Sequence, residues 1–147
     1  MEKLTNLGLR AAVKMVAPNA KVYAPDRDYS LPTLHWLLKV FFPWFQAEMF
    51  RIVANKWDKR FDCDNFAQFF SAWAAVSHWS ADKQPGHPEG LAVGECWYKL
   101  DSGGGHAINV IVTEEDGEQV VVPIEPQNGK RLELSQTELH SIWLVKF

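Results

Sequence analysis

The stretch HAINVIVTEEDGEQVVVPIE, residues 106–125, decides the fold of this 147-residue chain. Two segments rich in valine and isoleucine, 106–113 and 119–125, flank the pair Asp116 and Gly117. Asp-Gly between two such apolar runs is the strongest short-range signal of a β-hairpin with a two-residue loop. The sequence therefore predicts two antiparallel strands joined at this pair.

The register of the hairpin then places its side chains. A two-residue loop sets His106 opposite Gln127 and Ile108 opposite Glu125, and directly opposed residues point to the same side. His106, Glu125 and Gln127 are therefore expected on one face, with Glu125 diagonal to His106. A four-residue loop preserves this face, whereas a three-residue loop reverses it.

The residues before the hairpin are predicted to be mostly helical. Apolar residues recur at three- and four-residue spacings, and prolines and capping residues mark the ends of the segments. The helix that starts at Asp62 carries the aromatic stripe Phe66, Phe69, Phe70 and Trp73. Helices are expected over 4–17, 30–42, 44–54 and from 62 to about 79, with a polar loop over 23–29.

Further strands are predicted in the second half, over 91–100 and 142–147. Ser135 and Glu138 form a capping-box pattern for a short helix between them. Helices followed by an antiparallel sheet indicate an α+β fold. The length fits one domain, 1–147, with the N-terminal helices packed on the C-terminal sheet.

Composition excludes several classes of protein. The chain is 47% hydrophobic and 22% charged, with a formal net charge of −3, which is unlike a disordered chain. The slight acidic excess argues against a nucleic-acid partner. No apolar run is long enough to span a bilayer, so no membrane partner is expected. Charges interrupt the N-terminal apolar residues, which argues against a secretory signal and for a cytoplasmic protein. The oligomeric state is left open.

Cys63 is the candidate nucleophile. It follows Asp62 at the start of a predicted helix, where the helix dipole favours a thiolate. His106 could take the thiol proton, and Glu125 could orient the imidazole. Cys96, which stands beside Trp97 and Tyr98 in a predicted strand, is expected to pack in the core.

Three motifs resemble one known superfamily. FDCDNFA (61–67), GGGHAINVIV (103–112) and PIEPQNGK (123–130) occur in the order found in papain-like and transglutaminase-like cysteine hydrolases. The resemblance is closest to the protease domain of the Marasmius oreades agglutinin, and next to the bacterial transglutaminase-like cysteine proteinases. It covers about half of the chain and implies a papain-like fold.

The resemblance also implies roles for individual residues. Cys63, His106 and Glu125 take the positions of the catalytic triad of a thiol hydrolase that cleaves a peptide or isopeptide bond in a protein or peptide substrate. Gln127 is the reserve third member. Papain-like enzymes usually place an oxyanion-hole glutamine shortly before the cysteine; the sequence departs from this pattern, and Asn55 is the candidate substitute, with the Cys63 backbone N–H as the second donor. Calcium dependence in both named groups points to Ca²⁺ bound by the carboxylates of Asp62 and Asp64.

Other interpretations stay open at this stage. NlpC/P60-type peptidoglycan amide hydrolases also place an Asp-Cys pair at a helix start, but they follow the cysteine with serine and use a further histidine. A non-catalytic binding module on the same fold is the non-enzyme alternative, and phage genomes encode such small domains. For Cys63 alone, a packed and inert thiol is the simplest alternative.

Overall fold

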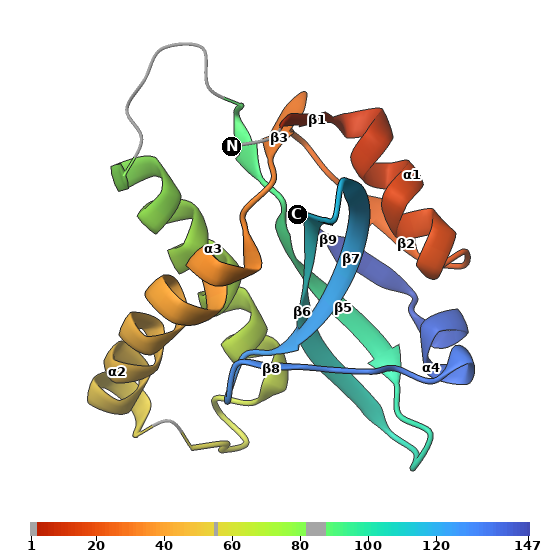
Figure 1. Cartoon of the computed structure of the whole chain (residues 1–147). Coiled ribbons are helices and arrows are strands. Elements are labelled where there is room, and N and C mark those ends of the chain that lie inside the picture. Colours follow the sequence, from red (N-terminus) through yellow and green to blue (C-terminus); the bar gives the residue numbers. More distant parts are fainter. Residues whose placement is uncertain (1–2, 55, 82–87) are drawn as a thin grey trace.

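The computed structural model describes residues 3–54, 56–81 and 88–147 (Figure 1). The elements of the first part are β1 Lys3–Thr5, α1 Asn6–Val16, β2 Lys21–Tyr23, β3 Asp28–Ser30, the π-helix η1 Trp36–Phe41, α2 Phe42–Val53 and α3 Cys63–Ala81. Those of the second part are β4 Gly90–Leu91, β5 Val93–Lys99, β6 Gly105–Glu115, β7 Glu118–Glu125, β8 Lys130–Arg131, α4 Gln136–Ser141 and β9 Leu144–Lys146.

The strands of the described residues form two sheets. One has the order β1-β3-β4, and the larger one has the order β2-β9-β5-β6-β7-β8. The pairs β2–β9 and β3–β4 are parallel, and the other pairs are antiparallel. The prediction of helices followed by one antiparallel sheet is therefore wrong.

The short N-terminal strands explain this difference. Strands β2 and β3 take up parts of the segment 21–30, most of which was predicted to be a polar loop. Each is only three residues long, too short to show a period-two pattern in the sequence. They exist because distant strands offer them backbone partners, β9 for β2 and β1 and β4 for β3.

The helical predictions hold in part. A helix boundary was expected before Pro43, but η1 runs directly into α2. Pro43 lies in the first turn of α2 and just after the π-helix η1, so the change from π-helix to α-helix occurs at the proline and the helical segment does not end there. The capping box at Ser135 and Glu138 is confirmed, because both of its hydrogen bonds are present at the start of α4. Within the described ranges, no helix has the length and apolar character needed to cross a membrane.

The β6–β7 hairpin has the predicted two-residue loop. Glu115 lies opposite Glu118, and the ladder continues to the pair Asn109 and Ile124. The loop residues Asp116 and Gly117 have φ angles of 53° and 81°. Two positive φ values are characteristic of the type I′ turn, whose twist matches that of the strands. The register that sets the faces of β6 and β7 is thus confirmed.

Both faces of the larger sheet are covered. Figure 1 shows α1 and α4 on one side of it and α2 and α3 on the other. Ile108 of β6 belongs to a buried cluster with Leu9 of α1. Ile111, on the opposite face of β6, belongs to a second cluster with Phe66 and Phe70 of α3. This packing fixes α3, and with it Cys63, against the sheet.

Candidate functional site

His106 and Glu125 form a close pair at one end of the larger sheet. Atom Nε2 of His106 lies 2.9 Å from Oε2 of Glu125, and the two side chains are 22% and 14% exposed. The backbone N–H of Gln127 donates to the other carboxylate oxygen, Oε1, at 3.2 Å. The carboxylate is therefore held on both sides and fixes one nitrogen of the imidazole. The hairpin register accounts for this contact.

Tyr98 of β5 completes the surroundings of His106. The two residues are paired across β5 and β6, and their rings meet edge to face at 5.9 Å between centroids. Burial raises the pKa of Tyr98 to about 12, and negative charge on groups that include Glu138, Glu125 and Cys63 adds to the rise. Cys63 and Glu125 thus both lie within electrostatic range of the Tyr98 hydroxyl.

The raised pKa of Tyr98 makes stability depend on alkaline pH. Its ordinary pKa is 10.0 and its folded value is about 12, so this contribution is complete below pH 10 and is lost as the pH rises through about 12. Between pH 10 and pH 12 the unfolding free energy of the wild type should therefore decrease. In Tyr98→Phe, which has no hydroxyl to ionise, we expect this decrease to be smaller by about 1–2 kcal/mol. Urea unfolding at successive pH values measures this, with the exposed Tyr23→Phe as control. Parallel wild-type and Tyr98→Phe curves would contradict it.

Cys63 is the first residue of α3 and is half-buried, with a free thiol. Its helix continues into Phe66 and Ala67, which are fully buried. Among the residues that the structure describes, no hydrogen bond or ion pair joins the sulfur of Cys63 to His106. The thiol is related to the His106–Glu125 pair through Tyr98, which lies within electrostatic range of Cys63 and contacts the imidazole.

The two thiols differ in accessibility and are expected to differ in reactivity. Cys96 is fully buried, and burial raises its pKa to about 12. Because only a thiolate is alkylated at an appreciable rate, we expect iodoacetamide at neutral pH to label Cys63 at least ten times faster than Cys96. Peptide mass spectrometry of native and urea-unfolded protein checks this. Comparable labelling of both thiols in the native protein would refute it.

The acidic residues around Cys63 form a pair. The pKa of Asp62 is raised, mainly because its carboxyl shares a hydrogen bond with that of Asp64, and burial and like charge add to the rise. The side-chain oxygen of Asn65 is occupied by the backbone N–H of Asp62. In the described part of the chain, no three His, Cys, Asp or Glu residues converge to hold a metal ion. Asn55, the candidate oxyanion donor, lies outside the described residues.

Two residues of interest were missed from the sequence. Tyr98 contacts His106 only through the pairing of β5 with β6, which no turn signal predicted. Glu95 is buried in the same strand. It is the only charged residue between Leu91 and Tyr98, and a single carboxylate in such an apolar run is a signal of a buried polar contact.

No family model matches the chain, and no curated protein matches it. Several solved structures are similar to it, and two of them match over 99% of this chain at 25% identity. One is a PSL1a–E64 complex, with a TM-score of 0.73. The other is the Polyporus squamosus lectin bound to the human-type influenza-binding epitope Neu5Aca2-6Galb1-4GlcNAc, with a TM-score of 0.69. The chain spans about half of their length, 51% and 49% respectively.

This comparison overturns several predictions. The Polyporus squamosus structure is that of a lectin. On this comparison, the predicted membership of the papain-like or transglutaminase-like hydrolases is wrong, and so is the predicted papain-like fold. The predicted thiol hydrolase activity, with its NlpC/P60 alternative, is wrong for the same reason. So is the predicted protein or peptide substrate, since the ligand of that lectin is a sialylated glycan.

Proposed function

We propose that the chain is a ligand-binding module whose binding site is formed by Cys63, His106 and Glu125. The hydrogen bond between His106 and Glu125 carries the proposal, because it holds the imidazole in one orientation. The half-buried free thiol of Cys63 lies within electrostatic range of Tyr98, whose ring contacts that imidazole. Such an arrangement suits capture of a ligand with an electrophilic carbon. The function proposed is stoichiometric binding, without turnover.

The similarity to the PSL1a–E64 complex supports a small ligand of this kind. E64 carries an epoxide, a strained ring that a thiolate can open. In the proposed adduct, Cys63 Sγ forms a bond to one epoxide carbon while the bond from that carbon to the ring oxygen breaks. The proton of the thiol ends on that oxygen, giving a hydroxyl. Atoms and electrons balance without any oxidant or reductant.

The experiment is intact-mass measurement after incubation with E64 at neutral pH. We expect a mass gain of one E64 per chain in the wild type and none in Cys63→Ser. Cys96→Ser is the matched control and should still gain one E64, because Cys96 is buried. An unmodified wild type, or equal modification of Cys63→Ser, would overturn the proposal.

Glycan binding is the second candidate function, and the Polyporus lectin with its sialylated trisaccharide favours it. Isothermal titration calorimetry with that trisaccharide tests it directly. Saturable binding that survives Cys63→Ser would place glycan recognition at another site of this chain. No heat above dilution up to millimolar trisaccharide would remove this candidate.

We keep calcium as a proposal for Asp62 and Asp64 alone. Two neighbouring carboxylates offer hard oxygen ligands, whereas calcium takes six to eight oxygens, so water would have to complete the shell. Added CaCl₂ should raise the Tm of the wild type and leave that of Asp64→Asn unchanged. Equal Tm shifts in both proteins would contradict a site at this pair.

We also propose a cytoplasmic, reducing location for the protein, because the ligand site at Cys63 requires a free thiol.

A further inference from the structure

Helix α2 carries apolar residues on the side that faces solvent as well as on the side that faces the core. Six of its residues are exposed, and Arg51 is the only polar one among them. The other five are Pro43, Trp44, Ala47, Phe50 and Ile52. The outer side of a surface helix usually consists of polar and charged residues, so an apolar outer side marks a contact surface. We call these five residues, together with the exposed Val40 of η1, the α2 face.

The segment that contains the α2 face is basic, although the whole chain is acidic. Segment 36–60 contains five basic residues and only two acidic ones, Glu48 and Asp58. Its formal charge is therefore +3, and the rest of the chain carries −6, since the whole chain carries −3. All five basic residues are exposed; they are Lys39, Arg51, Lys56, Lys59 and Arg60.

The positions of these charges make them available to a partner. Lys39 precedes Val40 at one end of the α2 face, and Lys56 lines a pocket with Trp57 at the other end. Trp57 is itself 55% exposed. Within the described part of the chain, Lys39, Lys56 and Lys59 form no ion pair. Three ammonium groups close to exposed aromatic side chains are therefore not neutralised by a described carboxylate.

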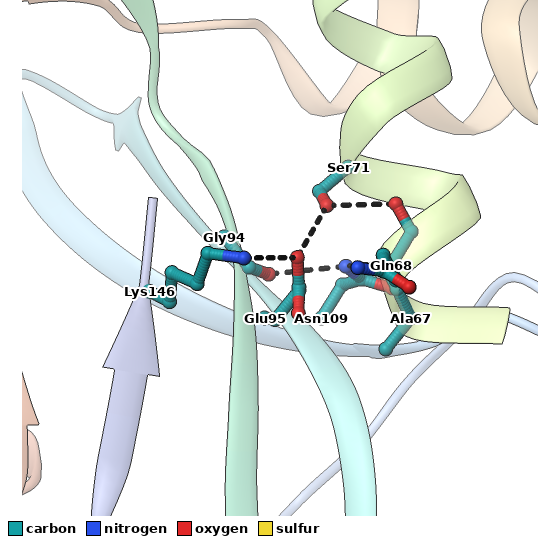
Figure 2. Close-up of polar contacts among 7 residues, drawn as sticks. All are labelled: Ala67, Gln68, Ser71, Gly94, Glu95, Asn109 and Lys146. Carbon is teal, nitrogen blue, oxygen red and sulfur yellow. Dashed lines mark hydrogen bonds and ion pairs between the residues drawn. The ribbon is translucent and has the colours of Figure 1, made fainter. Parts of the chain in front are cut away.

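The contacts of α3 explain why the α2 face stays uncovered. Figure 2 shows α3 tied to the larger sheet: Asn109 of β6 donates through Nδ2 to the carbonyl oxygen of Ala67 at 2.9 Å. The hydroxyl of Ser71 donates to the carboxylate of the buried Glu95 at 3.2 Å. Helix α2 packs on α3 in turn through Phe45, which is fully buried. Because both helices are held on this inner side, neither can turn to cover the outer side of α2.

Apolar and basic side chains together favour an anionic lipid surface as the partner. Tryptophan and phenylalanine enter the boundary between headgroups and acyl chains, and lysine and arginine attract anionic headgroups. The negative charge of the rest of the chain is repelled by such a surface, which turns the α2 face toward it. A second copy of the chain is disfavoured, because a twofold dimer would place two segments of charge +3 against each other.

We propose that the α2 face binds the protein to the surface of a membrane that contains anionic phospholipid. Helix α2 lies in the plane of the interface, where Trp44 and Phe50 enter the headgroup region and Lys39 and Lys56 approach the anionic headgroups. The lack of a bilayer-spanning apolar run, which argued against a membrane partner, does not exclude such peripheral binding. The surface is separate from the site proposed at Cys63 and does not depend on it.

Cosedimentation of the full chain with vesicles of equal parts phosphatidylcholine and phosphatidylserine tests the proposal. We expect saturable binding by the wild type and about tenfold weaker binding by Phe50→Ala, which loses apolar burial in the interface. Leu7→Ala, at an exposed position of α1, is the matched control and should bind like the wild type. Lys56→Glu should also bind about tenfold more weakly. Lys21→Glu, which changes the net charge equally but in β2, should bind like the wild type.

Several outcomes would overturn the proposal. One is the absence of vesicle binding by the folded wild type, and another is equal binding by the wild type and the double variant of Phe50→Ala and Lys56→Glu, folded by circular dichroism. Equal binding to vesicles of phosphatidylcholine alone would remove the role of the basic residues and overturn it too. A wild-type dimer in sedimentation velocity that Phe50→Ala abolishes, without vesicle binding, would assign the α2 face to a second copy instead.

Discussion

Substitution of His106 by alanine is expected to slow the modification of Cys63 by E64 about 100-fold. A positioned imidazole that accepts and returns a proton typically contributes a factor of 10² to 10⁴ to a rate. His106 is held for this role by its 2.9 Å contact with Glu125 and its edge-to-face contact with Tyr98. The second-order rate constant, followed by intact mass against time, measures the effect.

Two variants separate the role of His106 from a general loss of structure. Glu125→Gln keeps an oxygen near the imidazole but removes the charge, so we expect a smaller decrease of about tenfold. His140→Ala, in an exposed position of α4, should react at the wild-type rate. If His106→Ala, folded by circular dichroism, reacted with E64 as fast as the wild type, the imidazole would have no part in the site.

Substitution of Phe70 by alanine is expected to cause the largest loss of stability, about 3–5 kcal/mol. Phe70 is fully buried. It meets Phe41 and Phe45 edge to face, at centroid distances of 5.2 and 5.1 Å. Truncation would therefore leave a cavity where η1, α2 and α3 meet, in a place where the surrounding rings have little freedom to collapse.

Urea unfolding followed by tryptophan fluorescence measures this loss. Phe50→Ala is the matched control, because Phe50 lies on the exposed side of α2, and it should change the unfolding free energy by less than about 0.5 kcal/mol. A Phe70→Ala midpoint equal to that of Phe50→Ala would mean that this aromatic cluster does not hold α3 on the sheet.

Local signals in the sequence predicted the elements that depend on local geometry. The Asp116-Gly117 pair determined the hairpin and its register, and Ser135 and Glu138 determined the start of α4. The short strands β2 and β3 could not be predicted in the same way, since they depend on partners more than fifty residues away, β9 for β2 and β4 for β3. The helix boundary predicted before Pro43 was wrong, because a proline fits the first turn of a helix as well as the position after the end of one.

The same distinction applies to the site. The contact of His106 with Glu125 follows from one hairpin, so the register alone predicted it. The approach of Cys63 to Tyr98 depends on how α3 packs on the sheet, and no local pattern encodes that packing. The family resemblance rested on a helix start and two strand segments. Such short motifs specify local geometry, which different functions can share.

The central claim is that Cys63, His106 and Glu125 form one ligand site. A crystal structure of the chain after reaction with E64 tests it most directly. We expect continuous electron density from Cys63 Sγ to a carbon of the ligand. We also expect the imidazole of His106 to lie within hydrogen-bond distance of the sulfur or of the new hydroxyl, and to remain paired with Glu125. Ligand density elsewhere, or an adduct on Cys63 with His106 turned away from it, would contradict the claim.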